Sequence, residues 1–352
     1  MHFLDGSLVP ENQEKLVITV APYAPAFEPG DGADIPVTMD EHVQIAVDCY
    51  NAGATVLHTH VRELDGKGSK RLSKFNELLA RLRKAVPDMI LQVGGSISFA
   101  PEGEGEAAKW LSDDTRHMLA ELDPKPDQVT VAVNTAQMNV VELMTPEDVA
   151  GISLSRPEVW NAYEEMTVPA GPQWLREHLR RLQAAKIQPH FQLVGKPSLL
   201  TLERLIRAGH YRGPLNMTWN AIGGGFDTPD PYSMMDFLRH APDGACVTLE
   251  AIMRQCLPVN TMAIAMGLHV RCGNEDNLWG PTGDPITSVK MVEQLVRISR
   301  ELGRGVATAK EARAIYRIGT QFNSVEQTLS ELRYPQHRRP TRPALAERKA
   351  AA

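Results

Sequence analysis

The sequence lacks any long apolar run. No stretch of its 352 residues approaches the roughly 20 consecutive apolar residues that a membrane-spanning helix requires. The first residues, MHFLDGSLVPENQEK, also lack the basic segment followed by an apolar segment that is typical of a signal peptide. We therefore expect a cytoplasmic protein that does not bind a membrane.

Cysteine is scarce and scattered. The four cysteines, Cys49, Cys246, Cys256 and Cys272, form no CxxC pair. This spacing argues against both a disulfide framework and a thiolate zinc site. We interpret the cysteines as buried thiols.

The chain also lacks a strong excess of charge. Its formal net charge is −6 and its isoelectric point is about 6.0, which gives no overall attraction to nucleic acid. Hydrophobic residues make up 43% of the chain and charged residues 23%, as in globular proteins that bury a large core. A small molecule is therefore the expected partner.

The chain does contain a regular alternation of short β-branched runs and segments of helical period. Eight runs predict β-strands at residues 16–21, 55–60, 89–94, 128–134, 189–194, 215–221, 245–251 and 268–273. No GxGxxG follows the first run, which argues against a doubly wound, dinucleotide-binding sheet. Eight βα repeats favour a closed parallel barrel, so the predicted fold class is α/β, a (β/α)8 TIM barrel.

Two segments exceed a minimal barrel. Residues 138–168, about 30 in number, are too many for a simple loop and predict a helical insertion over the barrel mouth. The end of the chain is rich in Arg and Pro and lacks periodicity. It predicts a C-terminal extension that is partly disordered or docks on a neighbouring subunit. We expect a barrel catalytic domain over residues 1–318 and an extension over residues 319–352.

Two histidines end the second predicted strand. In TVLHTHVRE, His58 and His60 are two residues apart, so both side chains point to the same face of the strand. In a barrel that face is the interior, at the carboxyl-terminal rim where active sites assemble. The pair is suited to holding one divalent metal with two neutral imidazoles, although hydrogen-bonded core histidines show the same pattern.

A carboxylate near the end of the eighth predicted strand completes this set. The segment LHVRCGNEDN carries Arg271, Glu275 and Asp276 as the strand runs into a loop. A closed barrel brings the eighth strand beside the first, within one strand of the histidines. Glu275 can then complete a His₂Glu site that leaves a coordination position open for substrate.

The sequence resembles the β-keto acid cleavage enzymes, a family of metal-dependent barrels, from about Lys15 to Ala314. The motifs that carry the resemblance are PVTMDEH, AGATVLHTHVRE, LQVGGS, AIMRQCLP, RCGNEDN and GRGVATAKEAR. HxHxRE together with a distant RCGxEDN is a specific combination.

The resemblance implies one Zn²⁺ per chain on His58, His60 and Glu275, with Arg271 and Asp276 as a catalytic pair. In the family reaction, a β-keto acid and acetyl-CoA give acetoacetate and a new acyl-CoA by enolate formation, Claisen condensation and retro-Claisen cleavage. Zinc would polarise the keto oxygen, and Asp276 would accept the α-proton. Arg271 would hold the pKa of Asp276 below that of a lone buried acid. The family also implies a homo-oligomer, often a homotetramer.

The substrate-binding residues match the family less completely. Thr135 corresponds to a family threonine that would act on the substrate carboxylate, but it can equally cap the turn. Gly95, Ser96 and Arg62 are the other expected substrate contacts. Family members typically carry Ser or Thr and then Thr-Gly-Gly after the third strand, whereas here the hydroxyl moves to Ser96.

Other departures concern specificity and CoA. Ala26 replaces an acid that would meet a substrate ammonium, and His190 and Gln192 replace an acidic pair, so the pocket is expected to be less negative than usual. We therefore expect an uncharged, aromatic or extended β-keto acid. The candidate wall and CoA residues are Tyr23, Phe27, Trp219, Arg254 and Gly223 to Gly225, each of which also has an ordinary packing or turn interpretation.

Three other functions compete with this interpretation. A metal-dependent hydrolase of the amidohydrolase type also uses HxH on a barrel strand, but it needs further ligands, and the sixth predicted strand contains no histidine. Non-haem iron binds the same two-histidine, one-carboxylate set. A binding barrel that has lost catalysis would not need the Arg271 and Asp276 pair.

Overall fold

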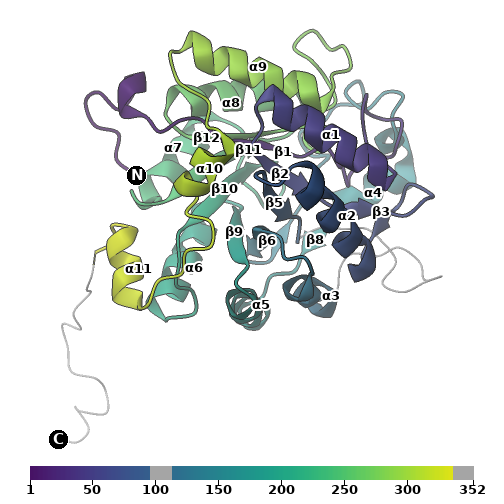
Figure 1. Cartoon of the computed structure of the whole chain (residues 1–352). Helices are drawn as coiled ribbons and strands as arrows, with labels where there is room; N and C mark the ends of the chain where they lie inside the picture. Colours follow the sequence, from purple (N-terminus) through teal and green to yellow (C-terminus); the bar gives the residue numbers. More distant parts are fainter. Residues whose placement is uncertain (96–112, 336–352) are drawn as a thin grey trace, which may run out of the picture.

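The computed structural model describes residues 1–95 and 113–335. Eight parallel strands close into a barrel in the order β1-β12-β11-β10-β9-β6-β5-β2 (Figure 1). Their bounds are β1 Ile18–Val20, β2 Val56–Thr59, β5 Ile90–Val93, β6 Gln128–Val133, β9 Gln188–Leu193, β10 Asn216–Ala221, β11 Cys246–Ala251 and β12 His269–Cys272. All eight strands expected from the sequence are present, and the TIM-barrel prediction is confirmed.

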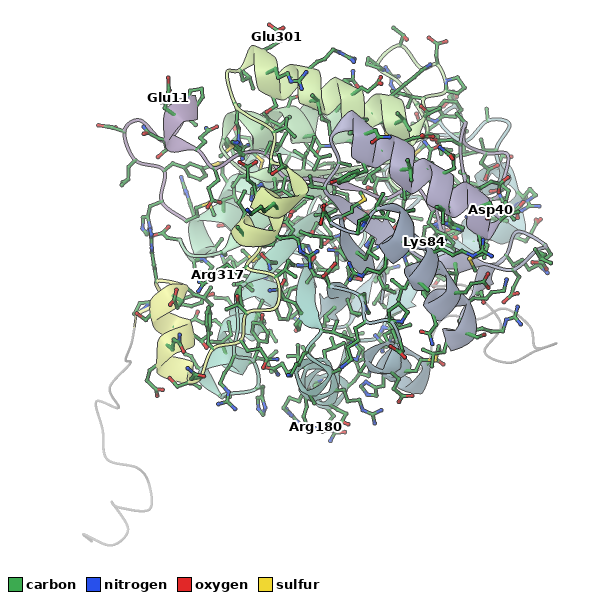
Figure 2. The ribbon with its side chains drawn as sticks, viewed as in Figure 1. Glu11, Asp40, Lys84, Arg180, Glu301 and Arg317 are labelled. Atoms are coloured by element: carbon green, nitrogen blue, oxygen red, sulfur yellow. The ribbon has the colours of Figure 1, made fainter. Side chains whose placement is uncertain are left out.

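Helices surround the barrel and bury one face each against it (Figure 1). They are α1 Met39–Ala52, α2 Leu72–Ala85, α3 Asp113–His117, α5 Pro172–Ala185, α6 Lys196–Arg207, α7 Pro231–His240, α8 Cys256–Ala265 and α9 Ser288–Glu301. Helix α1 begins at a capping box of Thr38 and Glu41. Charged side chains such as Arg180 and Glu301 project outward (Figure 2). No helix in the described part of the chain is long and apolar enough to cross a membrane.

The amino-terminal end of the barrel is closed by the segment that follows α9. Helix α10 (Ala309–Ile315) and Tyr316 pack on Val17, Val56 and Ile90, which precede or begin their strands, and form a small core separate from the main one. The Tyr316 hydroxyl lies 3.0 Å from Oγ1 of Thr248. Because the described residues fill this end, we expect a ligand to enter from the carboxyl-terminal end.

The insertion after β6 contains the expected helix. Strand β7 (Ala136–Gln137) pairs antiparallel with β8 (Thr167–Val168), and the 3₁₀ turn Ser153–Ser155 and helix α4 (Pro157–Glu164) lie between them. The Tyr163 hydroxyl of α4 donates to the Pro25 carbonyl (3.2 Å) in the loop after β1. The insertion therefore bridges to a loop at the carboxyl-terminal end of the barrel. A second small hairpin joins β3 (Val61–Arg62) to β4 (Gly68–Ser69).

The described part of the C-terminal extension packs on the barrel's own helices. Helix α11 (Val325–Glu331) lies beside α6 in Figure 1, and Leu329 and Leu332 are buried. The boundary at residue 318 and the behaviour of residues 336–352, which lie outside the described part, stay predictions.

Buried histidines predict that the fold loses stability in acid. Burial lowers the pKa of His42, His178, His190 and His269 from 6.5 to about 3. The unfolded chain therefore binds more protons below pH 6.5, so stability falls as the pH drops from 6.5 towards 3, by up to about 1.4 kcal/mol per pH unit for each histidine. Thermal unfolding followed from pH 7.5 to pH 4 should show a steep fall in Tm, less steep in His190→Gln. A flat Tm over this range would contradict the assignment of these histidines as neutral.

Candidate active site

Three potential metal ligands converge at the carboxyl-terminal end of β1, β2 and β12. His58 and His60 are 3% and 2% exposed, and their Nε2 atoms lie 3.2 Å apart. Oε1 of Glu275, in the loop after β12, lies 3.4 Å from Nε2 of His58. One ligand atom from each of the three residues lies within 4.8 Å of the others. The barrel thus brings together residues more than 200 positions apart in the sequence.

The spacing of these atoms fits a tetrahedral metal. Ligands bound at about 2.0–2.1 Å in a tetrahedron lie roughly 3.3 Å from one another, close to the separations around His58. Burial lowers the pKa of His60 to about 3, so its imidazole is neutral and able to donate a lone pair. The ring of Tyr23 packs on the His60 ring with centroids 4.9 Å apart, which holds its orientation. The three residues therefore fit a divalent ion such as zinc.

Gly94, at the exit of β5, makes room for both histidines. A Cβ atom at this position would lie 2.0 Å from Nε2 of His60 and 2.9 Å from Nε2 of His58. The strand can approach the ligands this closely only without a side chain. The motif LQVGGS contains this glycine, but the sequence gives no sign of which atoms it faces.

Arg271 organises the acidic side of the site. Its Nε and one terminal nitrogen donate to the two carboxylate oxygens of Asp276 at 2.9 and 2.8 Å, and the same terminal nitrogen donates to Glu275 at 2.6 Å. All three side chains are at most 10% exposed. The two-point contact fixes the plane of the Asp276 carboxylate.

The pKa values of the two carboxylates, Glu275 and Asp276, are shifted in opposite directions. Burial would raise the pKa of Glu275, but the charge of Arg271 opposes it, and the pKa is held well below its usual range. Burial raises the pKa of Asp276, and the charge of Arg271 opposes that rise. Glu275 is therefore suited to remain an anionic ligand, and Asp276 to accept a proton.

Glu250 is a third carboxylate at this site, and it was missed in the sequence. It lies on β11 with Oε2 3.5 Å from Nε of Arg271, and burial raises its pKa to about 8. Asn220, its register partner on β10, hydrogen bonds to it. An acidic residue inside the apolar run ACVTLEA was the available signal, because alternation places it on the inner face.

A cavity of about 100 Å³ opens beside these residues. His58, His60, Glu275, Asp276 and Glu250 line one side of it. The facing wall is largely apolar and comes from the insertion and the loops after β9, β10 and β11: Met138, Val140, Tyr163, Met166, Val168, Val194, Ile222, Phe226 and Ile252. The arrangement can bind a small molecule with a polar reacting end and an apolar body.

The family model for beta-keto acid cleavage enzymes matches residues 15–318. The chain belongs to the β-keto acid cleavage enzyme family. It is 28% identical over 306 residues to the 3-keto-5-aminohexanoate cleavage enzyme of Acetoanaerobium sticklandii, covering 86% of this chain and 98% of that protein. It is 26% identical over 294 residues to the 3-oxoadipate:acetyl-CoA acetyltransferase of Cupriavidus necator, covering 81% and 88%.

A further relative and a solved structure agree with this membership and fold. The 3-dehydrocarnitine:acetyl-CoA trimethylamine transferase of Rhizobium meliloti is 22% identical over 289 residues, covering 79% of this chain and 88% of that protein. The structure of ObcA with a C4-CoA adduct and oxalate superposes with a TM-score of 0.58 at 14% identity, covering 81% of this chain and 68% of that chain. At that identity the likeness concerns the barrel fold alone.

Two residues expected to act on substrate from the family resemblance have other tasks here. Oγ1 of Thr135 accepts a hydrogen bond from Ala170 N–H (3.0 Å), so this exposed residue caps a turn, and its neighbour Asn134 lines the cavity instead. The Arg62 guanidinium donates to four backbone carbonyls, those of Gly66, Tyr23, Ala24 and Phe27. These contacts indicate that Arg62 positions the loops around it and that Thr135 caps a turn. The expected roles of both residues on substrate stay predictions.

The loop after β5 differs from expectation in a similar way. Gly95 N–H donates to Oγ1 of Thr130 (2.8 Å), and Gly94 rather than Gly95 lines the cavity. Ser96 lies outside the described residues. His190 is a buried, hydrogen-bonded residue with Nε2 2.8 Å from Oγ1 of Thr218; it does not line the cavity and is not among the three potential metal ligands.

The aromatic wall expected from the sequence comes from different residues. Tyr23 donates to the Val61 carbonyl (3.0 Å) and Phe27 is buried in the core, so both are packing residues. Trp219 donates to Asp227 (2.8 Å) and packs near Phe237 of α7, on the outer face of β10. Tyr163 and Phe226 supply the aromatic part of the cavity.

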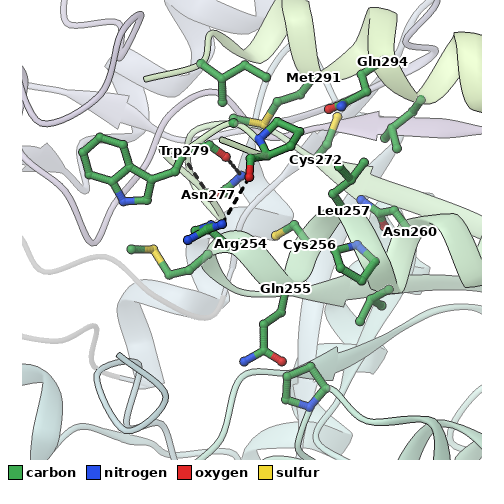
Figure 3. Close-up of a pocket in the computed structure, with 18 of the residues that line it drawn as sticks. Arg254, Gln255, Cys256, Leu257, Asn260, Cys272, Asn277, Trp279, Met291 and Gln294 are labelled. Atoms are coloured by element: carbon green, nitrogen blue, oxygen red, sulfur yellow. Dashed lines mark hydrogen bonds between the residues drawn. The ribbon is translucent and has the colours of Figure 1, made fainter. Parts of the chain in front are cut away.

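The residues considered for CoA lie outside this cavity. A Cβ atom on Gly224 or Gly225 would meet the backbone of the insertion within 3 Å, and Gly224 N–H donates to Glu142, so these are turn glycines. Arg254 donates to the Pro281 carbonyl (3.1 Å) and lines a larger cavity of about 480 Å³ (Figure 3). That cavity contains none of the three metal ligands.

A second group of possible ligands, Glu14, Cys246 and His269, lies at the closed end of the barrel. Nδ1 of His269 accepts a hydrogen bond from Val17 N–H (3.2 Å), and burial keeps the imidazole neutral. Its only lone pair is therefore in use and Nε2 carries the hydrogen. Cys246 donates to the Ile315 carbonyl, and burial raises its pKa to about 12, which opposes a thiolate. This group does not offer a metal site.

Gly94→Ala should abolish metal binding without unfolding the protein. The added methyl group displaces the His60 ring by more than the tolerance of a metal–nitrogen bond. Elemental analysis after dialysis against zinc should find about one metal per chain in the wild type and less than about a tenth of that in the variant. Gly171→Ala is the matched control, since nothing lies within 4 Å of its added Cβ. Full occupancy in Gly94→Ala would remove these residues from the metal site.

Proposed function

We propose that this chain cleaves a β-keto acid in the presence of acetyl-CoA, giving acetoacetate and a new acyl-CoA. The observation that carries the proposal is the pairing of Asp276 with Arg271 beside the three-ligand group His58, His60 and Glu275. Family membership and the acetyl-CoA-dependent activities in the names of two relatives support it.

The metal would be zinc, held by His58, His60 and Glu275. When bound, it supplies a Lewis acid for the keto oxygen of the substrate. The neutral state of His60 and the anionic state of Glu275 are the forms that such a site requires. We choose zinc over iron because of the family resemblance, and metal analysis would distinguish the two.

Asp276 acts as the base in the proposed reaction. It takes a proton from the carbon between the two carbonyls, and the resulting enolate forms a carbon–carbon bond to the acetyl carbonyl as the CoA thiolate leaves. The thiolate then adds to the original keto carbon, and the bond to the central carbon breaks. This releases the new acyl-CoA and the acetoacetate carbanion, which takes its proton back from Asp276.

Arg271 positions this base. Two hydrogen bonds at 2.9 and 2.8 Å hold the carboxylate plane, and the positive charge limits the rise in its pKa. The base therefore stays ionised more readily than a lone buried acid while keeping a fixed direction towards the cavity. A binding barrel without catalysis would have no use for this arrangement.

An amidohydrolase-type hydrolase has less support. His190, the only extra histidine available on β9, is bonded to Thr218, and β10 contains no histidine. The proposed assembly as a homotetramer and the cytoplasmic location stay predictions from the sequence.

The acyl group of the substrate is proposed to carry a hydrogen-bond donor. The sequence argument for an uncharged substrate counted the acids lost at Ala26 and Gln192, but it overlooked Glu250. Among the described residues, Oε2 of Glu250, Oδ1 of Asn220 and Oε1 of Gln192 are buried acceptors without a hydrogen-bond partner, and all three residues line the cavity. A hydroxyl or ammonium on the acyl chain would satisfy them, while the apolar wall holds the rest of the chain.

Asp276→Asn should keep metal and substrate binding but lose turnover. The amide preserves the size of the side chain and removes the base, so kcat should fall about a hundredfold or more. The assay is mass spectrometry of acetoacetate and new acyl-CoA formed from a panel of β-keto acids with acetyl-CoA. Solvent deuterium exchange at the substrate α-carbon should stop in the variant. Exchange at the wild-type rate would assign the base to another residue.

Three β-keto acids of equal chain length, ending in methyl, hydroxyl or ammonium, test the choice of acyl group. We expect kcat/KM to be about tenfold higher or more for a donor-bearing acid than for the methyl compound, since leaving a buried acceptor unsatisfied costs about 1–3 kcal/mol. Glu250→Leu should reduce this ratio towards one. Met166→Leu, on the apolar wall, should change all three substrates alike. A preference for the methyl compound in the wild type would contradict the proposal.

A further inference from the structure

Four buried amide side chains form a continuous hydrogen-bonded row inside the barrel. They are Gln92, Gln128, Gln188 and Asn216, on the adjacent strands β5, β6, β9 and β10, and all are at most 6% exposed. We refer to these four residues as the amide row. One end of the row meets the metal ligand His58, and the other end meets the backbone after α10.

Hydrogen bonds connect the row from end to end without a break. Oε1 of Gln92 lies 2.8 Å from Nδ1 of His58, and its amide nitrogen donates to Oε1 of Gln128 at 2.9 Å. The amide nitrogen of Gln128 donates to Oε1 of Gln188 at 2.8 Å. The amide nitrogen of Gln188 donates to the carbonyls of Tyr316 and Arg317 at 3.2 and 3.1 Å.

Asn216 reinforces the far end of the row. Its amide nitrogen donates to Oε1 of Gln188 and to the Tyr316 carbonyl, both at 2.8 Å. Oε1 of Gln188 therefore accepts two hydrogen bonds, one from each side. Rotating the Gln188 amide by 180° would bring its oxygen against two carbonyl oxygens and its nitrogen against two N–H donors.

The direction of the whole row follows from these end groups. A backbone carbonyl can only accept, so Gln188 must present its nitrogen to Tyr316 and its oxygen to Gln128. Gln128 must then present its nitrogen to Gln188 and its oxygen to Gln92. Gln92 in turn must present its oxygen to His58. The assignment of each amide, which is ambiguous for an isolated side chain, is thus fixed by the backbone at the far end.

We infer that the amide row sets the tautomer of His58. Because Gln92 offers an oxygen, Nδ1 of His58 must carry a hydrogen. In the neutral imidazole the lone pair therefore lies on Nε2, the atom that faces His60 and Glu275. That is the tautomer a metal requires at Nε2. Gln92, Gln128 and Gln188 are positioning residues, and the Tyr316 segment that closes the barrel floor takes part in preparing the metal site. The inference rests on the proposed metal site but not on the proposed reaction.

The test combines nitrogen NMR of the histidine rings with zinc affinity. In metal-free protein labelled with ¹⁵N-histidine, the wild-type His58 should show a single tautomer with hydrogen on Nδ1. Gln92→Leu removes the acceptor, so the spectrum should contain Nε2–H tautomer and zinc should bind about ten- to a hundredfold more weakly. Gln92→Glu keeps an oxygen for Nδ1–H and should retain the wild-type tautomer and at least the wild-type affinity.

The variant Gln188→Leu distinguishes an effect transmitted along the amide row from a local effect of packing next to His58. This residue touches neither His58 nor Gln92, yet its loss frees Gln128 to rotate and should give a mixture of His58 tautomers with a smaller loss of zinc affinity. Thr218→Val is the matched control, a buried interior residue of β10 outside the row, and should leave both readouts unchanged. A wild-type His58 with hydrogen on Nε2, or unchanged tautomer and affinity in Gln92→Leu, would overturn the inference.

These readouts remain informative if the proposed reaction fails. The NMR spectrum and the zinc titration need no keto acid or acetyl-CoA. A protein that binds zinc as described but cleaves none of the β-keto acids would disprove the proposed function and leave the amide row supported. If the enzyme is active but the His58 tautomer is unchanged in Gln92→Leu, the proposed function would be supported and the inference about the amide row disproved.

Discussion

One arginine among three buried carboxylates is the interaction on which the site depends. Arg271 contacts Asp276, Glu275 and Glu250 within the barrel, so negative charge exceeds positive charge before any ligand is bound. Burying unbalanced charge is costly, and two features of the site reduce the excess negative charge. Burial raises the pKa of Glu250 to about 8, so a proton relieves one charge. The His58, His60 and Glu275 group offers a place for a divalent cation that balances the others.

The barrel interior is organised by polar contacts along its length. At the closed end, Tyr316 bonds to Thr248 and its backbone receives the amide row. Above that layer lie the histidines and Arg271, and above them the open cavity. A polar interior of this kind is stable only when most of its groups are satisfied. In the amide row, hydrogen bonds in one consistent direction satisfy the side-chain oxygens of the three glutamines, whereas Oδ1 of Asn216 has no partner. Among the described acceptors that lack partners, those on Glu250, Asn220 and Gln192 belong to residues that line the cavity.

Chemistry and selectivity come from different parts of the chain. The potential metal ligands, Arg271 and Asp276 lie at the carboxyl-terminal ends of β2 and β12 and in the loop that follows β12, where short strands in a closed barrel fix their positions. The cavity wall comes from the insertion, through residues such as Met138 and Tyr163, and from loops after β9 to β11. The insertion can therefore vary without moving the reacting groups, as expected when one barrel supports many substrates.

The eight strands and the candidate reacting residues could be predicted from the sequence. Strand period predicts the eight strands, because this pattern depends on neighbours within a few residues. The same period placed His58 and His60 on one face, and barrel closure brought Glu275 to them. Only the tertiary structure decided the tasks of Arg62, Thr135, Gly94 and Glu250. Each task depends on which atoms, remote in sequence, come within a few ångströms. Backbone carbonyls bind the guanidinium of Arg62, and a backbone N–H in a turn binds the hydroxyl of Thr135. The imidazoles of His58 and His60 leave no room for a Cβ at Gly94, and Arg271 contacts the carboxylate of Glu250. No periodicity encodes those distances, because packing between strands and loops sets them.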